Sequence, residues 1–363
     1  MNQVLFHEKN RNPYYIVSNR YTRTSAGIKT LHLLCHALNS IGERAFLMVY
    51  PYHPSDYSVN PDLLTPLLNQ KIIDYHFQRS LTPILIYPET IVGNPFHAPF
   101  VVRYLLNFPG LLGGNAGFQE NEFCISYSNK LGETVPNNQM TLFIPTSDPA
   151  IFTPEPRSKR KGTCFYAAKY QDVHNGKLFP ITKNSYEITR DKPDSLTPIE
   201  IASIFRRSEL FYCYENTALA IEAILCECPV VFLPNPYLTE SIGSKEMGWD
   251  GIAWGTNPLE IDKARKTVKI GRENYIKLFK DFNDQLLYFV EKTQFSINGI
   301  PYHKKIKIPK HLNRNFFYPI NSIIALISLF NFTRKNLGIN YTIKRSIRRI
   351  LKKGFKINLD RID

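Results

Sequence analysis

The stretch from Tyr214 to Pro234 places polar side chains between two apolar segments. Glu215 and Thr217 follow the apolar run "LFYCY", and Glu222 lies in the short helical segment "ALAIEAIL". If a helix begins near Thr217, its first N–H groups lack internal partners and its dipole presents partial positive charge. Such a helix end can hold a phosphate, while the two carboxylates can take a pair of sugar hydroxyls, such as those of a ribose.

The same spacing also fits a purely structural explanation. Thr217 then only caps the helix, Glu215 is a solvated acid, and Glu222 is buried and hydrogen bonded. No Gly-x-Gly-x-x-Gly or Walker sequence occurs in the chain, so the dinucleotide and nucleoside-triphosphate sites built on those loops are not indicated. The spacing alone leaves the phosphate site and the structural explanation open.

Alternating apolar and helical segments predict the elements that position these side chains. Segments 14–18, 45–50 and 83–88 read as buried strands, and segment 25–42 has the spacing of an amphipathic helix. The pattern restarts after a segment rich in prolines and charge, 145–162, which we expect to be a domain boundary. Strands separated by helices predict parallel sheets, whose ligands bind beyond the carboxyl ends of the strands.

These motifs together resemble the GT-B glycosyltransferases, in particular the group 1 enzymes of glycosyltransferase family 4. The resemblance rests on the strand, turn and Glu-Ala pair before "PVV", on "IPTSDPAIFTP", and on "SNRYTRTSAGIKTLHLLCHALNSIGERAFLMV". A further segment, "YPETIVGNPFHAPFVVRYLLNFPG", is similar to bacterial surface-polysaccharide transferases, rhamnosyltransferase-like members among them. The likeness covers about residues 14 to 260.

The resemblance implies a GT-B fold, in which two Rossmann-like α/β domains face a central cleft. Residues 1–150 would bind the acceptor, residues 151–310 would bind the nucleotide sugar, and residues 311–363 would form a basic helical tail. The implied activity is hexosyl or deoxyhexosyl transfer to a polysaccharide or lipid-linked oligosaccharide, as in O-antigen or capsule synthesis. The alternative is a non-catalytic GT-B-like protein that binds saccharides or partner proteins.

Carried over residue by residue, the resemblance implies a metal-independent donor site in the second domain. Glu222 matches the family glutamate that binds the nucleotide ribose, and Lys169 matches a basic residue that neutralises the donor diphosphate. Tyr214 falls where the family has its other glutamate, so Glu215 is only an approximate match. The donor-binding residues that we expect are Lys169, Lys177, Tyr214, Glu215, Asn216, Thr217 and Glu222.

Three positions depart from the family pattern or match it ambiguously. The second basic residue of the family matches Lys177 in "NGK", although His174 also lies nearby. Glu227 stands where a glycine is usual before the "PVV" strand. Together with Tyr214, this departure keeps the non-catalytic alternative open.

On the acceptor side, we expect Glu89 and His97 to be the catalytic candidates. Glu89 follows the strand at 83–88, where a carboxylate facing the cleft can act as general base, whereas a lone histidine is more often structural. Gly27 and Arg103 are candidates for an acceptor or phosphate loop. At Gly27 the absence of a Cβ lets the backbone approach a ligand, and Arg103 lies in the same region as Glu89 and His97. Gly27 is equally explained as a helix-start glycine. The sequence does not decide between an inverting and a retaining transfer.

Composition predicts a cytoplasmic globular protein. Of 363 residues, 43% are hydrophobic, which is enough for sizeable cores. Six cysteines lie mostly inside apolar runs with no Cys-x-x-Cys pair, so we expect reduced, buried thiols and no metal site. The first residues lack the pattern of a signal peptide.

Positive charge is concentrated at the carboxyl end of the chain. Residues 301–363 hold 15 Lys and Arg against 2 acidic residues, which leaves the rest of the chain near neutral. Segment 341–356 has apolar residues on one helical face and basic residues elsewhere, typical of a helix on an anionic membrane surface. A basic helix packed on the protein is the alternative, and no nucleic-acid partner is expected because no nucleic-acid fold is recognisable.

Overall fold

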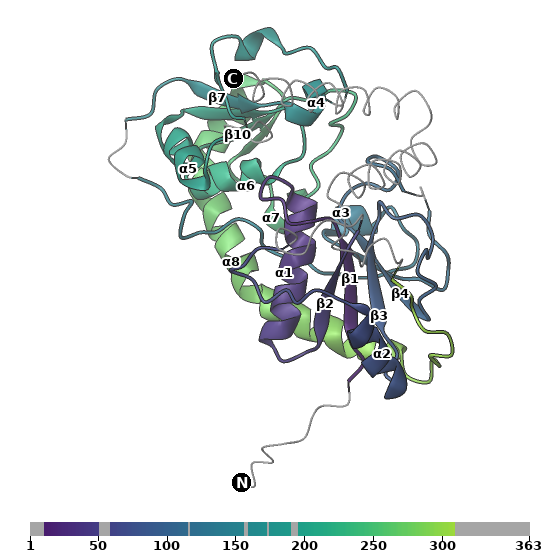
Figure 1. The fold of residues 1–363 in the computed structure, drawn as a ribbon. Helices are drawn as coiled ribbons and strands as arrows, with labels where there is room; N and C mark the ends of the chain where they lie inside the picture. Colours follow the sequence, from purple (N-terminus) through teal and green to yellow (C-terminus); the bar gives the residue numbers. More distant parts are fainter. Residues whose placement is uncertain are drawn as a thin grey trace, which may run out of the picture.

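The computed structural model describes residues 11–50, 59–114, 117–155, 159–172, 174–189 and 195–308. These residues form two α/β domains, each built on its own sheet (Figure 1). The strand orders are β2-β1-β3-β4-β5-β6 in the first sheet and β11-β10-β9-β7-β8 in the second, and the pairings are parallel. The predicted class of two Rossmann-like domains is confirmed.

The first sheet has continuous apolar strands because helices cover both of its faces. One face carries α1 and the end of the last helix, and the other carries α2. Strands predicted at 14–18, 45–50 and 83–88 form within a residue of their expected bounds. The elements of this domain are β1 (Tyr14–Ser18), α1 (Ala26–Ser40), β2 (Ala45–Val49), α2 (Gln70–Gln78), β3 (Ile84–Pro88), β4 (Phe100–Leu105), β5 (Phe123–Ser126), α3 (Asn129–Gly132) and β6 (Asn138–Thr141).

The second domain repeats the alternation after the proline-rich segment. Its helix α5 starts with a capping box, in which the Thr197 hydroxyl accepts from Glu200 N–H and the Glu200 carboxylate accepts from Thr197 N–H. The elements are β7 (Thr163–Tyr166), α4 (Ala168–Asp172), η2 (Pro180–Thr182), β8 (Tyr186–Glu187), α5 (Pro198–Arg207), β9 (Leu210–Cys213), α6 (Ala218–Leu225), β10 (Val230–Phe232), α7 (Ser244–Met247), β11 (Ile252–Trp254) and α8 (Pro258–Ser296).

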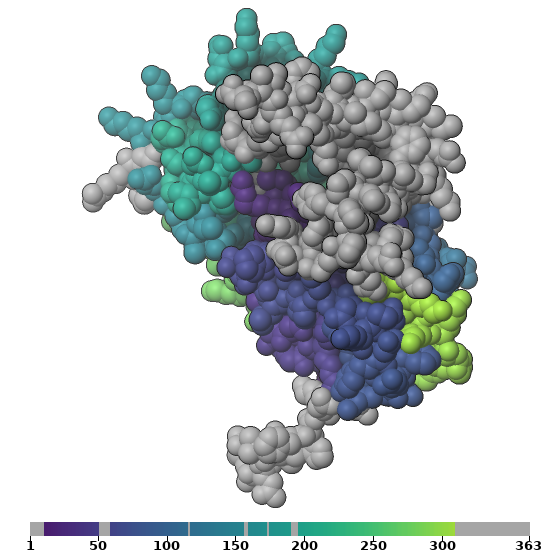
Figure 2. Space-filling model, viewed as in Figure 1, coloured from purple at the N-terminus to yellow at the C-terminus, as the bar shows by residue number. Residues whose placement is uncertain are grey.

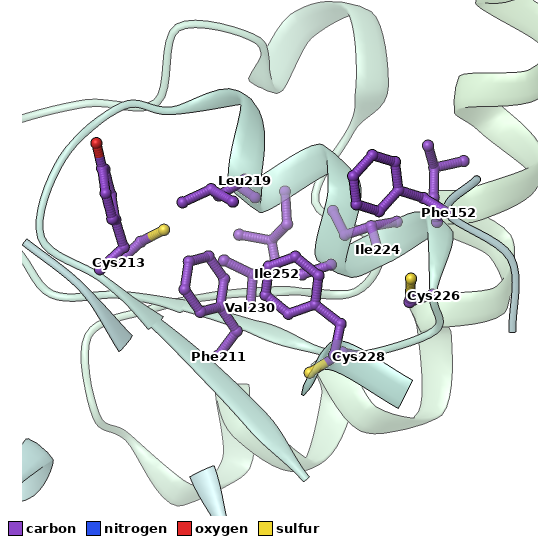
Figure 3. Close-up of a cluster of buried hydrophobic side chains, with 14 of the residues drawn as sticks. Phe152, Phe211, Cys213, Leu219, Ile224, Cys226, Cys228, Val230 and Ile252 are labelled. Carbon is purple, nitrogen blue, oxygen red and sulfur yellow. The ribbon is translucent and has the colours of Figure 1, made fainter. Parts of the chain in front are cut away.

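The core of the second domain is an apolar cluster around α6 (Figure 3). Leu219 and Ile224 of α6 pack against Phe211 and Val230 of the sheet, and Phe152 of the linker closes one end. All six cysteines of the chain are buried, as predicted, and four of them belong to this cluster. The four are Cys164, Cys213, Cys226 and Cys228.

Helix α8 connects the two domains along most of the molecule (Figure 1). Its earlier part packs Tyr275 into the second core, whereas Phe289 and Val290 belong to the first core. The chain then continues on the first domain, where Ile306 is buried and Lys305 pairs with Asp74 at 2.7 Å. The carboxyl end of the segment expected at 151–310 therefore packs on the first domain rather than on the second.

The two domains also touch near the start of α1. The purple segment of the first domain reaches the teal surface of the second in the space-filling view (Figure 2). Arg23 Nη1 donates to Leu196 O at 3.0 Å, and Lys29 Nζ donates to Thr146 O at 2.6 Å. These contacts hold the amino end of α1 against the second domain and the linker.

The predicted tail, 311–363, and its amphipathic segment, 341–356, lie outside the described residues. Within 11–308, excepting the short gaps named above, no helix has the length and apolar character that a membrane span requires.

Candidate functional site

A pocket lies between the two domains, at the edge where strands of both sheets end. The second domain contributes α4 and the loops after α4, β9 and β10, and the first domain contributes the loop after β4. Carboxyl ends of parallel strands are the usual position of ligand sites in such sheets. The lining residues are Asn107, Leu111, Leu112, Lys169, Tyr170, His174, Tyr214, Glu215, Asn216 and Tyr237.

Tyr214 forms the structural floor of this pocket. It is fully buried, its hydroxyl accepts from Phe179 N–H at 2.7 Å, and it lies 2.8 Å from Thr182 Oγ1. Its ring stacks on Tyr170 with centroids 5.1 Å apart. The phenol therefore fixes the turn at the position where the resembling family has a glutamate.

Glu215 and Lys169 form a charged pair at the mouth of the turn. Glu215 is 7% exposed, and its Oε2 accepts from Tyr170 N–H at 3.0 Å. Lys169 Nζ lies 4.0 Å from Glu215 Oε1, and the lysine side chain is 47% exposed. One buried carboxylate thus stands beside one accessible cation, so the pocket offers both a hydrogen-bond acceptor and a positive charge to a ligand.

Asn216 and Thr217 complete the turn before α6. Asn216 Nδ2 donates to Glu240 O at 2.9 Å, and its Oδ1 accepts from Ile242 N–H at 3.0 Å. Thr217 is the N-cap of α6, and its Oγ1 accepts from Leu219 N–H at 3.3 Å. The helix begins where the sequence predicts it, and Thr217 acts as its cap.

Glu222 is not brought together with the pocket residues. It is 2% exposed on α6 and lies toward α8, where its charge adds to the effect of burial in raising the pKa of Tyr275. The Tyr275 hydroxyl in turn accepts from Ser147 N–H at 3.1 Å in the interdomain linker. The structure therefore places Glu222 behind the pocket, near the junction of the domains, and not at its wall.

His174, and not Lys177, reaches the pocket from the loop after α4. The His174 ring stacks on Tyr237 with centroids 3.8 Å apart and an interplanar angle of 12°. Burial, and then the charge of Lys169, lower the pKa of His174. Lys177 is exposed and does not line the pocket, although its carbonyl accepts from the Tyr170 hydroxyl at 3.2 Å.

Glu89 lies directly behind the first-domain wall of the pocket. It follows β3, is 3% exposed, and its Oε2 accepts from Leu106 N–H at 2.9 Å. Burial raises its pKa to about 7, even though this hydrogen bond and the charge of Arg103 act in the opposite direction. A carboxyl with this pKa can take up and release a proton near neutral pH.

Arg103 does not serve as a ligand contact, because its guanidinium is fully used inside the first domain. Its Nε and Nη2 donate to the two oxygens of the Glu122 carboxylate, at 2.9 and 3.0 Å, and the side chain is fully buried. The remaining N–H groups donate to the carbonyls of Pro88, Ile91 and Gly93. The sequence could not reveal this pairing, since Glu122 is on a separate segment.

His97 and Gly27 lie outside the pocket lining as well. His97 is exposed in a turn before β4, where its N–H donates to Asn94 O at 3.1 Å. Gly27 is the second residue of α1, and a Cβ there would meet Leu106 Cδ1 at 3.7 Å, an ordinary contact. The packing of the chain itself therefore does not require a glycine at this position.

Glu227 lies at a position whose backbone conformation favours glycine. Its backbone is left-handed, with φ of 56°, in the turn between α6 and β10. A left-handed turn is where glycine costs least, and the family usually has glycine there. The departure in sequence therefore leaves the local geometry in place.

The sequence did not single out five of the pocket residues. Four are apolar or aromatic and one is an amide, and none of them has a chemical signature by itself. Their common signal is position, since they lie in the segments that follow predicted strands. They are Asn107, Leu111, Leu112, Tyr170 and Tyr237.

Comparison with known proteins gives matches of fold only. No protein-family model matches the chain, and no curated protein is similar to it. Among solved structures, it is similar to AviGT4, a glycosyltransferase involved in avilamycin A biosynthesis, with 13% identity, TM-score 0.47, and 79% of this chain and 99% of that chain covered. At this identity and TM-score the likeness carries no argument about activity.

Two further solved structures are similar at the same level. The O-GlcNAc transferase of Thermobaculum terrenum has 11% identity and TM-score 0.44, with 80% of this chain and 69% of that chain covered. The spinosyn rhamnosyltransferase SpnG has 13% identity and TM-score 0.36, with 80% of this chain and 97% of that chain covered.

Proposed function

We propose that this chain is a GT-B glycosyltransferase, which moves a sugar from a nucleotide-sugar donor to a saccharide-containing acceptor in the interdomain pocket. The observation that carries the proposal is the meeting of Lys169, Glu215 and the turn before α6 at the carboxyl ends of neighbouring parallel strands, β7 and β9. The first domain closes the other side of this pocket, so that two substrates can meet there.

The donor side needs a cation where the diphosphate leaves. Breaking the anomeric bond builds negative charge on the nucleoside diphosphate, and a fixed positive group stabilises that charge. Lys169 is accessible in the pocket and supplies this charge without a metal ion. Glu215 is held by the Tyr170 N–H in a position to accept hydrogen bonds from sugar hydroxyls.

On the acceptor side, Glu89 is the proton acceptor of an inverting transfer. Its pKa of about 7 lets a substantial fraction of the carboxyl be ionised at neutral pH. It does not line the pocket itself, but its carboxylate accepts from the N–H of Leu106, the residue before the lining residue Asn107. An acceptor hydroxyl must therefore pass the first-domain wall to reach it.

The acceptor class and location are a finer part of the proposal. A polysaccharide or lipid-linked oligosaccharide acceptor at the inner face of a membrane is supported by the basic composition of residues 301–363 in the sequence. The non-catalytic alternative, a GT-B-like saccharide-binding protein, is favoured by Tyr214 in place of a family glutamate. Donor hydrolysis separates the two.

A thermal-shift screen tests the donor site. UDP, GDP, ADP, CMP and dTDP are added singly and as their common sugar conjugates. A ligand at about 100 times its dissociation constant adds about 2.7 kcal/mol to the free energy of unfolding. We expect one base to give a clear shift that Lys169→Ala abolishes and that Lys183→Ala, at an exposed lysine outside the pocket, leaves intact. No shift with any nucleotide would contradict the proposal.

A further inference from the structure

We propose that the loop at 107–114 selects an acceptor that carries an apolar group next to its reacting saccharide. This inference rests on the proposed function, in which the pocket holds both a donor and an acceptor. Its starting observation is that Leu111 is 41% exposed and Leu112 is 38% exposed, and that both line the pocket. Two adjacent exposed leucines give the pocket an apolar surface beside its charged pair. A purely polar ligand gains nothing by covering that surface, whereas an apolar group does.

The loop holds these leucines outward by its backbone. Gly110, Gly113 and Gly114 have φ of 82°, 105° and 87°, values that other residues rarely adopt. Leu111 N–H donates to Phe108 O at 3.1 Å, which closes the turn before the tip. The exposure of the leucines therefore follows from a defined turn.

The loop is also seated on the residue proposed as the proton acceptor. A Cβ at Gly114 would lie 2.0 Å from the backbone carbonyl oxygen of Glu89, so the two backbones are in close contact. At the other end of the loop, Leu106 N–H donates to the Glu89 carboxylate. A group that contacts the tip of the loop is thus held at a fixed position relative to Glu89.

The two walls of the pocket differ in the side chains that they offer to a ligand. The second-domain wall provides the cation of Lys169 and the carboxylate of Glu215, which suit a nucleotide sugar. The first-domain wall provides Asn107 and the two leucines and has no charged side chain among its lining residues. The apolar contacts of the first-domain wall are therefore left for the acceptor, and the class that fits is a glycoside with an alkyl, isoprenoid or aromatic group.

Paired probes test this assignment. Methyl and octyl β-glycosides of glucose, galactose and N-acetylglucosamine are titrated below the critical micelle concentration, and binding is followed by saturation-transfer NMR. We expect at least one octyl glycoside to bind at least about tenfold more tightly than its methyl partner, as burial of apolar surface requires. We expect Leu111→Ser and Leu112→Ser each to remove most of this preference. Leu259→Ser, at a 79% exposed leucine on α8, is the matched control and should retain it.

The outcomes separate this inference from the proposed function. An octyl preference that is lost in the loop variants and kept in the control supports the acceptor class. No octyl preference, or one that survives both loop substitutions, overturns it. If nucleotides still stabilise the protein in that case, the donor site stands and only the acceptor assignment fails, whereas the absence of any nucleotide shift removes the proposed function itself.

Discussion

Replacing Glu89 with glutamine tests the most unusual ionisable group of the first domain. The carboxyl ordinarily has a pKa of 4.5, and burial raises this to about 7 in the folded protein. Between these pH values the folded protein holds a proton that the unfolded chain has released, so the free energy of unfolding falls as pH rises. At about 1.36 kcal/mol per pKa unit, the fall amounts to about 3 kcal/mol and is complete above the folded pKa.

Glu89→Gln keeps an oxygen that can accept from Leu106 N–H and removes the titration. We therefore expect the variant to lack this fall, so that its free energy of unfolding rises by about 3 kcal/mol relative to that of the wild type when the pH is raised from about 4 to about 8. Urea unfolding at both pH values measures the gain, and Glu291→Gln, at an exposed site on α8, is the control that should show none. Identical pH dependence in the wild type and Glu89→Gln would refute the reasoning.

The same variant also reports on catalysis, and three other substitutions test particular points of the structure. If Glu89 accepts the proton, Glu89→Gln should lower the rate of sugar transfer by about 10²- to 10⁴-fold, and an unchanged rate would exclude that role. Lys177→Ala should leave the nucleotide thermal shift intact because the side chain does not line the pocket, whereas a lost shift would favour the family resemblance over the observed placement. Glu227→Gly should raise the urea midpoint slightly. The steric strain of a non-glycine residue with left-handed backbone costs about 1–2 kcal/mol, which exceeds the entropy cost of glycine, about 0.5–1 kcal/mol. A lowered midpoint would show that the turn is not strained. Gly114→Ala should destabilise the protein by about 2–4 kcal/mol. The control is Gly42→Ala, at a residue that also has positive φ but has no atom within 4 Å of the added Cβ, and it should cost only about 1–2 kcal/mol. Equal losses would refute the close contact between Gly114 and Glu89.

Local pattern was sufficient for the fold class and for many of the elements. The strands at 14–18, 45–50 and 83–88 and the helix start after Thr217 are visible in the sequence, because apolar periodicity and capping residues act over a few neighbouring positions. The burial of the six cysteines follows from the same apolar runs. Two α/β halves in succession then imply a pocket at the carboxyl ends of their strands.

Only the tertiary structure decided which side chains meet in that pocket. Leu112 of one domain and Tyr237 of the other share a pocket because of turn geometry and domain packing, which no local pattern encodes. Arg103 is withdrawn from any ligand by Glu122, and α8 leaves the second domain to pack on the first. Each of these outcomes depends on contacts between segments far apart in the chain, and such contacts form only when the chain folds and the two domains pack together.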